Sequence, residues 1–115
     1  MQITLLHGYP DDIGKRFAWC GYGKGPKSYP NTGSTIGDPL QLPGYQYYID
    51  SVESTGVLTT DGTYIVFFQP QAVGARQAFN ARWFAFTSSG VGAEASNATD
   101  LSSKSIQISG LGGTY

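Results

Sequence analysis

A predicted β-hairpin centred on Asp61-Gly62 constrains the fold more than any other stretch of this chain. An Asp-Gly pair between two β-rich runs favours a two-residue type I′ turn, which needs a positive φ at both positions. The run from 64 to 68 is apolar on both faces, so we expect a central strand that is covered on both sides. The two-residue loop predicts four facing pairs: Thr60 and Thr63, Thr59 and Tyr64, Leu58 and Ile65, and Val57 and Val66.

Further strands are expected on either side of this hairpin, over residues 2–6, 45–53, 79–87 and 104–111. Ile106 and Ile108 alternate with polar residues, which indicates one core face and one solvent face. Residues 88–100 are expected to form a loop of small side chains. No long helix or internal repeat is indicated. The sequence therefore predicts a single all-β domain over residues 1–115, an antiparallel β-sandwich or a jelly-roll-like barrel.

Glycine and proline punctuate the segment from Gly14 to Gly44 so densely that no helix can run through it. Only Arg16 to Tyr22 has the composition of a short strand. Loops of this length are uncommon inside compact domains and are usually functional or disordered. Because the segment also carries large apolar side chains, we expect residues 14–44 to form an extended arm or long loop. It would become ordered against its own domain, a second copy or a larger surface.

Composition narrows the classes of function. The chain has 115 residues, of which 13% are charged and 14% are aromatic, and its net charge is −1. This balance suits a domain in a crowded structural setting better than a freely diffusing enzyme, and it gives no overall attraction for nucleic acid or anionic membranes. Four cations and no acid lie between Asp12 and Asp38, so this segment is expected to dock on an acidic surface or on a second copy.

The chain carries few signals of cellular compartment. Cys20 is its only cysteine, which excludes an internal disulfide and fits synthesis in a reducing cytosol. The first residues lack the charged and apolar regions of a signal peptide. No apolar run approaches the roughly 20 residues that cross a bilayer. We therefore expect no membrane partner, and any export by another route, such as assembly into a particle released by lysis.

Interleaved basic and aromatic side chains form the best candidate binding surface. Arginine, tyrosine and tryptophan are common anchors of protein interfaces. The same mixture can stack on single-stranded nucleic acid or on a glycan, and packing of the aromatic rings inside their own domain is the competing interpretation. The residues that we predict at a protein interface are Lys15, Arg16, Phe17, Trp19, Tyr22, Lys24, Lys27 and Tyr29.

Catalytic and cofactor sites are not indicated. His7 and Cys20 could form a nucleophile pair only if the arm folded back on the first strand. Asp50 and Glu53 fall on opposite faces of one predicted strand and cannot converge as acid and base. The stretch Gly21–Ser28 lacks the first glycine and the following helix of a phosphate-binding loop. We therefore predict no enzymatic activity, no cofactor and no metal ion.

A tyrosine-rich strand keeps a second class of function open. Tyr45, Tyr47 and Tyr48 lie close together in the strand predicted over 45–53. Tyrosines on an open sheet face can stack against sugar rings, although tyrosine is also common in strands for ordinary packing reasons. A small carbohydrate-binding module is therefore an alternative.

Three stretches of the chain have a distinctive composition: the run Gly21-Tyr22-Gly23-Lys24-Gly25-Pro26, the aromatic strand over 79–86 and the Ser/Gly-rich ending over 101–110. Together they resemble the small head-decoration, or cement, proteins of tailed bacteriophages. The resemblance implies a β-sandwich or jelly-roll body that self-associates and staples neighbouring major capsid subunits without catalysis.

The function expected from this resemblance is that of a non-enzymatic virion structural protein on the capsid exterior, assembled in the host cytoplasm. Its partners would be the major capsid protein and copies of itself, as a dimer or trimer, with no membrane or nucleic acid involved. A structural protein of the phage tail or the head-tail connector is a further alternative, because the same fold could bind a ring-like partner.

Overall fold

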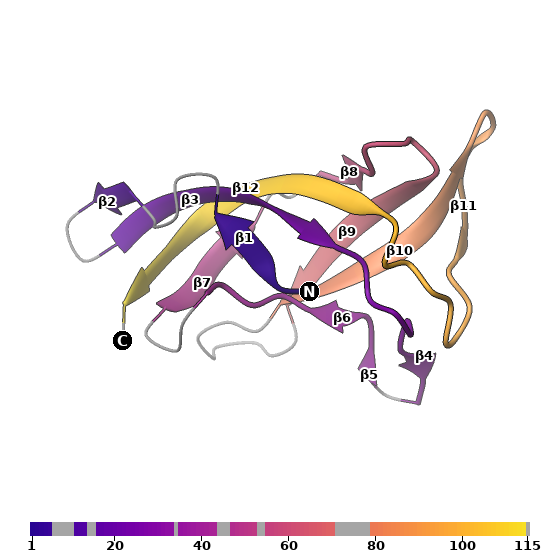
Figure 1. Ribbon diagram of the computed structural model, residues 1–115, viewed down its shortest axis with the longest axis horizontal. Coiled ribbons are helices and arrows are strands. Elements are labelled where there is room, and N and C mark those ends of the chain that lie inside the picture. The colour runs from indigo at the N-terminus through magenta and orange to yellow at the C-terminus, as the bar shows by residue number, and fades with distance from the viewer. Residues whose placement is uncertain are drawn as a thin grey trace.

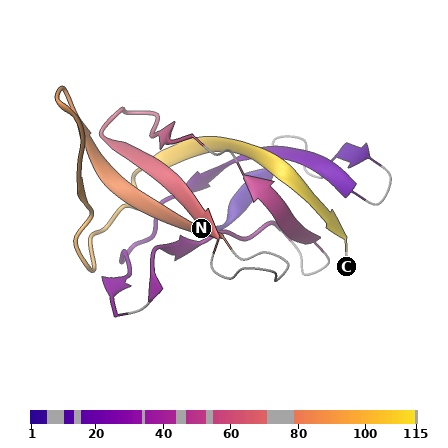
Figure 2. The ribbon, with the colours of Figure 1, turned by 180° about the vertical axis from the view of Figure 1, so that it is seen from behind.

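The structure is a computed structural model that describes residues 1–5, 11–13, 16–33, 35–43, 47–52, 55–70 and 79–114. These residues are all-β and form two antiparallel sheets around one core, consistent with the predicted β-sandwich. The molecule is elongated, with extents of 43 × 29 × 23 Å. Figures 1 and 2 show the β2–β3 end of the first sheet and the β10–β11 end of the second sheet at opposite ends of the long axis.

The first sheet is built on its two longest strands, which pair along nine positions. Its order is β1-β3-β12-β7, and β2 pairs with the same strand as β1. The long curved strand in Figure 1 is β12. The bounds are β1 (Ile3–Leu5), β2 (Asp11–Ile13), β3 (Arg16–Lys24), β7 (Tyr47–Val52) and β12 (Ser105–Thr114).

The second sheet has the order β11-β10-β9-β8, and a short strand, β6, also pairs with β10. The observed bounds of β10 match the prediction over 79–87. A separate small hairpin joins β4 and β5. The bounds are β4 (Asn31–Thr32), β5 (Thr35–Ile36), β6 (Asp38–Pro39), β8 (Val57–Leu58), β9 (Tyr64–Pro70), β10 (Phe79–Thr87) and β11 (Gly90–Glu94).

The register of the predicted hairpin is confirmed, but its turn type is wrong. Val57 pairs with Val66 and Leu58 with Ile65, as expected. The turn itself is closed by the Gly62 N–H, which donates to the Thr59 carbonyl at 2.9 Å. Among the described residues of this loop, only Gly62 has a positive φ, of 73°, so the type I′ turn and the Thr60–Thr63 pair do not form.

A hydrogen-bonded aspartate explains the different turn. Asp61 Oδ1 accepts bonds from the Thr59 hydroxyl at 2.8 Å, the Thr63 hydroxyl at 2.8 Å and the Thr63 N–H at 3.1 Å. Aspartate side chains commonly organise turns by bonding to the backbone two residues on. The loop is therefore wider than two residues. Hydrogen bonds to the Asp61 side chain stabilise it in place of the type I′ turn that the Asp-Gly pair predicted.

The described part of the 14–44 segment belongs to the domain. Residues 16–24 form β3 in the interior of the first sheet, and β6 joins the second sheet. Of the three surfaces that the sequence left open for this segment, its own domain is the one seen here. The predicted strand over 16–22 is longer than expected because Gly23 and Lys24 continue its pairing with β12.

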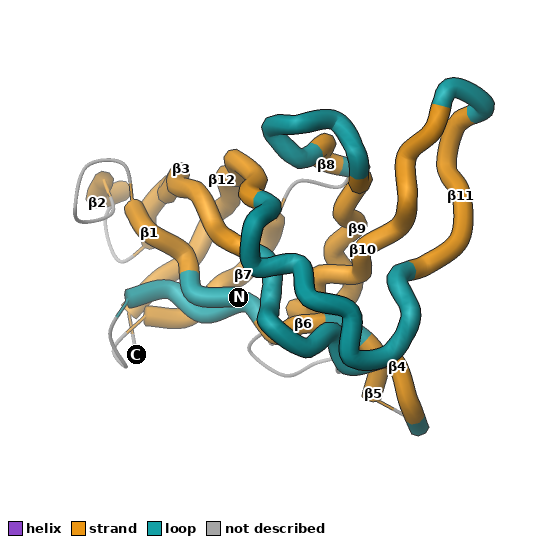
Figure 3. Tube along the Cα trace, turned by 45° about the vertical axis from the view of Figure 1, so that its right-hand side comes forward, coloured by secondary structure: helices purple, strands orange, loops and turns teal. Residues whose placement is uncertain are grey.

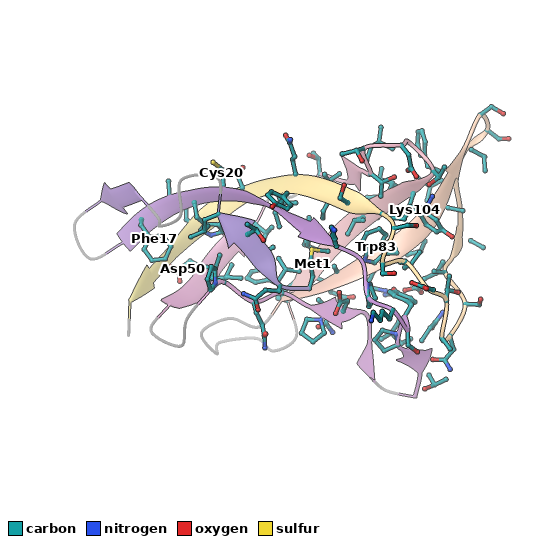
Figure 4. All side chains as sticks on the ribbon, viewed as in Figure 1. Met1, Phe17, Cys20, Asp50, Trp83 and Lys104 are labelled. Atoms are coloured by element: carbon teal, nitrogen blue, oxygen red, sulfur yellow. The ribbon has the colours of Figure 1, made fainter. Side chains whose placement is uncertain are left out.

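Glycines in β3 allow this close packing. A Cβ atom on Gly21 would collide with the Thr4 carbonyl oxygen, and one on Gly23 would collide with the side chain of Met1. The α-ammonium group of Met1 is buried, lies 2.8 Å from Asp38 Oδ1 and donates to the Pro39 carbonyl. Figure 4 shows Met1 near the middle of the molecule. This contact ties the first sheet to β6 of the second.

Residues 88–100, predicted as a loop, contain the edge strand β11. The prediction is wrong because Gly90-Val91-Gly92-Ala93 has neither the apolar alternation nor the bulky residues that mark strands. Pairing with the long strand β10 makes these residues a strand although their own sequence does not favour one. Gly90 has a φ of 109°, a backbone conformation that favours glycine at the turn between the two strands.

Candidate functional site

The predicted basic and aromatic interface divides into a buried part and an exposed part. Phe17, Trp19 and Tyr29 have exposed fractions of 2%, 3% and 0%, so intramolecular packing, the competing interpretation, holds for these three. Tyr22 is 40% exposed, and Lys24 and Lys27 are also exposed. Lys15 and the side chain of Arg16 lie outside the described residues. The eight residues therefore do not form one continuous surface.

Strand alternation is the reason for this division. Neighbouring residues of a strand point to opposite faces, so Trp19, Gly21 and Gly23 face the core while Tyr22 and Lys24 face outward. Figure 4 shows Phe17 and Cys20 on opposite sides of β3, as this alternation requires. Residues 16–22 were expected as a short strand, but the interface prediction grouped residues of both strand faces into one surface.

The outer face of the first sheet is mainly polar. Tyr22 pairs with Thr4 on β1 and with Gln107 on β12, and both neighbours are exposed. Lys24 pairs with Ser105, and Cys20 pairs with Ser109. Leu111, which is 46% exposed, is the large apolar residue at the far end of this face.

The outer face of the second sheet is apolar, and we call it the outer apolar face. Its residues lie opposite one another in register: Phe84 pairs with Ile65, Ile65 with Leu58, and Phe86 with Val91. Directly opposite residues share one face of a sheet, and none of these side chains packs against the core. Leu58 and Val91 are 46% and 53% exposed, and the others are half-buried. The six members are Leu58, Ile65, Phe67, Phe84, Phe86 and Val91.

Aromatic contacts hold the middle of this face together. The rings of Phe67 and Phe84 lie 5.7 Å apart at an interplanar angle of 77°, the edge-to-face arrangement that aromatic pairs prefer. The Arg82 guanidinium lies 5.7 Å from the centre of the Phe84 ring. The strands bearing these residues cross the right half of Figure 1, with the β10–β11 end reaching furthest from the first sheet. The middle of the face is therefore held by contacts within the chain.

This arrangement bears on one expectation from the sequence. The run from 64 to 68 was expected to be covered on both sides, but Ile65 and Phe67 on its outer face are only half-buried. On the same face of β10, Asn80 is buried, whereas Arg82, Phe84 and Phe86 are half-buried. The signal for an apolar outer face was present in the predicted register, which already placed Leu58 beside Ile65.

A polar cluster borders the outer apolar face. Arg82 donates to both carboxylate oxygens of Glu94, at 3.0 and 2.7 Å, and the Tyr29 hydroxyl donates to Glu94 at 2.6 Å. The same hydroxyl accepts a hydrogen bond from the backbone N–H of Trp83 at 3.2 Å. Tyr29 thus occupies the edge of β10 between the positions paired with β6 and those paired with β11.

Hydrogen bonds and burial in this cluster shift the pKa values of Glu94 and Tyr29 in opposite directions. The hydrogen bond from Arg82 holds the pKa of Glu94 below its ordinary value, in spite of partial burial. Burial, followed by the hydrogen bond to Glu94, raises the pKa of Tyr29 above its ordinary value. At neutral pH the cluster is therefore a salt bridge with a neutral tyrosine, and its charges compensate each other.

A second polar group joins the two sheets at the β8–β9 loop. Lys104 Nζ lies 2.6 Å from Asp61 Oδ2, and the Thr60 N–H donates to the Ser105 carbonyl at 2.9 Å. The bonds from Lys104 and the two threonines hold the pKa of Asp61 well below its usual range. Lys104 is labelled in Figure 4, at the start of β12. Asp61 therefore has a structural role, as one partner in a contact between the two sheets.

The remaining candidate sites are not assembled in the described residues. Cys20 is half-buried on β3, and His7 and Glu53 lie outside the described residues. Among the residues described, no group of three His, Cys, Asp or Glu side chains could hold a metal ion. Tyr45 is also outside the description. Tyr47 and Tyr48 begin β7, with side chains that are not described.

Comparisons of the chain with protein-family models, curated proteins and solved structures gave no match in any of the three. In the described part of the chain, no helix has the length and apolar character needed to cross a membrane. The candidate site therefore rests on geometry alone, and it is the outer apolar face with its polar border. Figure 3 sets this second sheet, at the right, apart from the first sheet, at the left.

Proposed function

We propose that this chain is a non-enzymatic virion structural protein that decorates a phage head by binding major capsid subunits through its outer apolar face. The observation that supports this most is the row of six apolar side chains on a sheet face that does not pack against the core. Large contiguous apolar patches are rare on the surface of monomeric proteins and commonly mark protein–protein contacts. A protein surface is therefore the kind of partner that fits best.

The form of the face favours a rigid docking surface. Its side chains are held on paired strands and by the Phe67–Phe84 contact, so little ordering entropy is lost on binding. The Arg82–Glu94 pair at its border is neutral overall and can form the polar rim that interfaces usually have. On a closed shell, many such contacts act together, so each can be weak.

The test is co-sedimentation with empty shells assembled from the major capsid protein of the genome that encodes this chain. The proposal predicts saturable binding with a fixed ratio of chain to capsid subunit. Absence of binding, or a genome without a capsid gene, would overturn it. Binding to tail tubes or connector rings instead of shells would replace the head assignment with the tail or connector alternative.

A second candidate, a carbohydrate-binding module, is supported by one observation on the other sheet. Tyr22 is 40% exposed on a polar face, between Thr4 and Gln107. An exposed ring flanked by hydroxyl and amide groups has the chemistry that binds sugars. Binding on a glycan array that is lost in Tyr22→Ala would support this candidate, and an array without binding would remove it.

A further inference from the structure

The charged groups at the border of the outer apolar face are paired within the chain. All three guanidinium nitrogens of Arg82 donate hydrogen bonds: Nε and Nη2 donate to Glu94 at 3.0 and 2.7 Å, and Nη1 donates to Oε1 of Gln69 at 3.3 Å. The guanidinium also lies over the Phe84 ring. The two-bond arrangement by which arginine binds a carboxylate most strongly is therefore already used by Glu94.

A second ion pair lies in the loop that follows Leu58. Lys104 Nζ lies 2.6 Å from Asp61 Oδ2, so the two charges compensate each other there as well. The exposed cations of the basic segment lie elsewhere, because Lys24 is on β3 of the first sheet and Lys27 follows that strand. The six members of the face are themselves uncharged. Among the described residues, the outer apolar face and its border therefore carry no net charge.

We propose that the partner presents an uncharged, apolar protein surface to the outer apolar face, and that no charged group of the partner pairs with its border. This inference rests on the proposed function, because it names the chemistry of the capsid surface that the face would bind. The sequence predicted a different partner, an acidic surface that attracts the basic segment. An acidic surface would pair with free cations beside the face, and the described cations there, Arg82 and Lys104, are already paired.

A compensated border suits an apolar partner for a physical reason. Binding removes water from groups at the edge of an interface, and an ion without a counter-charge then loses solvation that an apolar surface does not replace. In the Arg82–Glu94 pair, both ions stay hydrogen-bonded when water is removed. A change of the border charge by one unit, in either direction, should therefore weaken the contact.

Two substitutions change the border charge in opposite directions. Glu94→Gln removes the carboxylate that compensates Arg82, so the border becomes positive. Gln69→Glu places a second carboxylate beside the same guanidinium, so the border becomes negative. Gln69 is exposed and its substitution leaves the Arg82–Glu94 pair in place, so this variant tests the inference even if Glu94→Gln does not fold. Gln107→Glu is the matched control, because Gln107 is exposed on the outer face of the first sheet.

Co-sedimentation with empty capsid shells over a range of salt concentrations provides the readout, after circular dichroism has checked the fold of each variant. Binding of the native chain should change by less than about twofold between about 0.05 and 0.5 M NaCl, because there is no net charge to screen. Glu94→Gln and Gln69→Glu should each bind at least about threefold more weakly than the native chain. Gln107→Glu should bind like the native chain.

The direction of each change separates the kinds of partner. Tighter binding of Glu94→Gln would indicate an acidic partner, tighter binding of Gln69→Glu would indicate a basic one, and either result would overturn the inference. Native binding that falls steeply with salt, or border variants that bind like the native chain, would overturn it too. In all these cases the shell is still bound, so the proposed function stands. A native chain that binds no shell at any salt concentration would overturn the proposed function and this inference together.

Discussion

The outer faces of the two sheets differ sharply, although both are built from paired antiparallel strands. The first sheet presents Thr4, Tyr22 and Gln107, a face that water can solvate. The second presents six apolar side chains, with the Arg82–Glu94 salt bridge at its border. A sheet in a two-layer fold needs one apolar face for the core, so the second apolar face on the second sheet calls for another explanation. Binding of a protein partner is the explanation that we propose.

The largest expected effect tests the inner face of the first sheet against its outer face, using two aromatic residues on β3. Trp19→Ala should lower the free energy of unfolding by about 3–5 kcal/mol, because the ring is buried and covers Gly110. Tyr22→Ala should change it by no more than about 0.5 kcal/mol. Urea unfolding of both variants provides the measurement. Equal effects would show that β3 does not separate core from surface as described.

The next effect concerns the hydroxyl group that borders the outer apolar face. Tyr29→Phe removes the acceptor of the Trp83 N–H and a donor to Glu94. Leaving such buried groups unpaired costs about 1–3 kcal/mol. Tyr22→Phe is the matched control, since its ring is 40% exposed, and it should be nearly neutral. A neutral Tyr29→Phe would mean that Tyr29 does not help to hold the edge of β10.

A smaller effect concerns acid stability. The pKa of Glu94 is lower in the folded chain than its ordinary value of 4.5, because Arg82 stabilises the carboxylate. Glu94 therefore stabilises the fold at pH above 4.5, and this contribution is lost as the pH falls through the lower folded-state pKa. Glu94→Gln should be less stable at neutral pH and should show a shallower fall in stability below pH 4.5. Thermal unfolding of the native chain and Glu94→Gln across this pH range provides the measurement. Parallel curves of stability against pH would show that Arg82 does not stabilise the Glu94 carboxylate.

The smallest effect concerns the contact between the two sheets at the β8–β9 loop. Asp61→Asn removes the charge that pairs with Lys104, but the pair is exposed and screened by solvent. We expect a slight loss of stability that disappears at high salt. Melting temperatures at low and high salt provide the measurement, with Asp100→Asn as an exposed control outside this contact. A loss independent of salt would point to the threonine bonds instead.

The sequence predicted those parts of the fold that depend on local pattern. The alternation of Ile106 and Ile108, the bounds of β10 and the pairing of Leu58 with Ile65 were all expected. The two errors in β structure have different causes. The turn at Asp61 is organised by side-chain bonds to Thr59 and Thr63, two residues away, and by the ion pair with Lys104. Residues 90–94 become a strand because β10 is there to pair with.

The candidate site was predicted less well, for a physical reason. The sequences that flank Tyr22 and Tyr29 are similar in composition, yet Tyr22 is exposed and Tyr29 is fully buried. What separates them is the contact of Tyr29 with Glu94 and Trp83, which are more than fifty positions away in the chain. A segment rich in glycine carries no local signal for such contacts. The apolar face had a signal in the register of the predicted hairpin, but burial on both sides explained it equally well.

Two leucines of equal exposure, one on each outer face, provide the most direct test of binding through the second sheet. Leu58 and Leu111 are both 46% exposed, so Leu58→Gln and Leu111→Gln change the same side chain at the same accessibility. Binding to capsid shells should weaken about fivefold to tenfold with Leu58→Gln, which corresponds to about 1–1.4 kcal/mol for the buried part of one leucine. It should stay unchanged with Leu111→Gln. Equal binding of both variants, or a loss confined to Leu111→Gln, would contradict the assignment of the second sheet as the binding face.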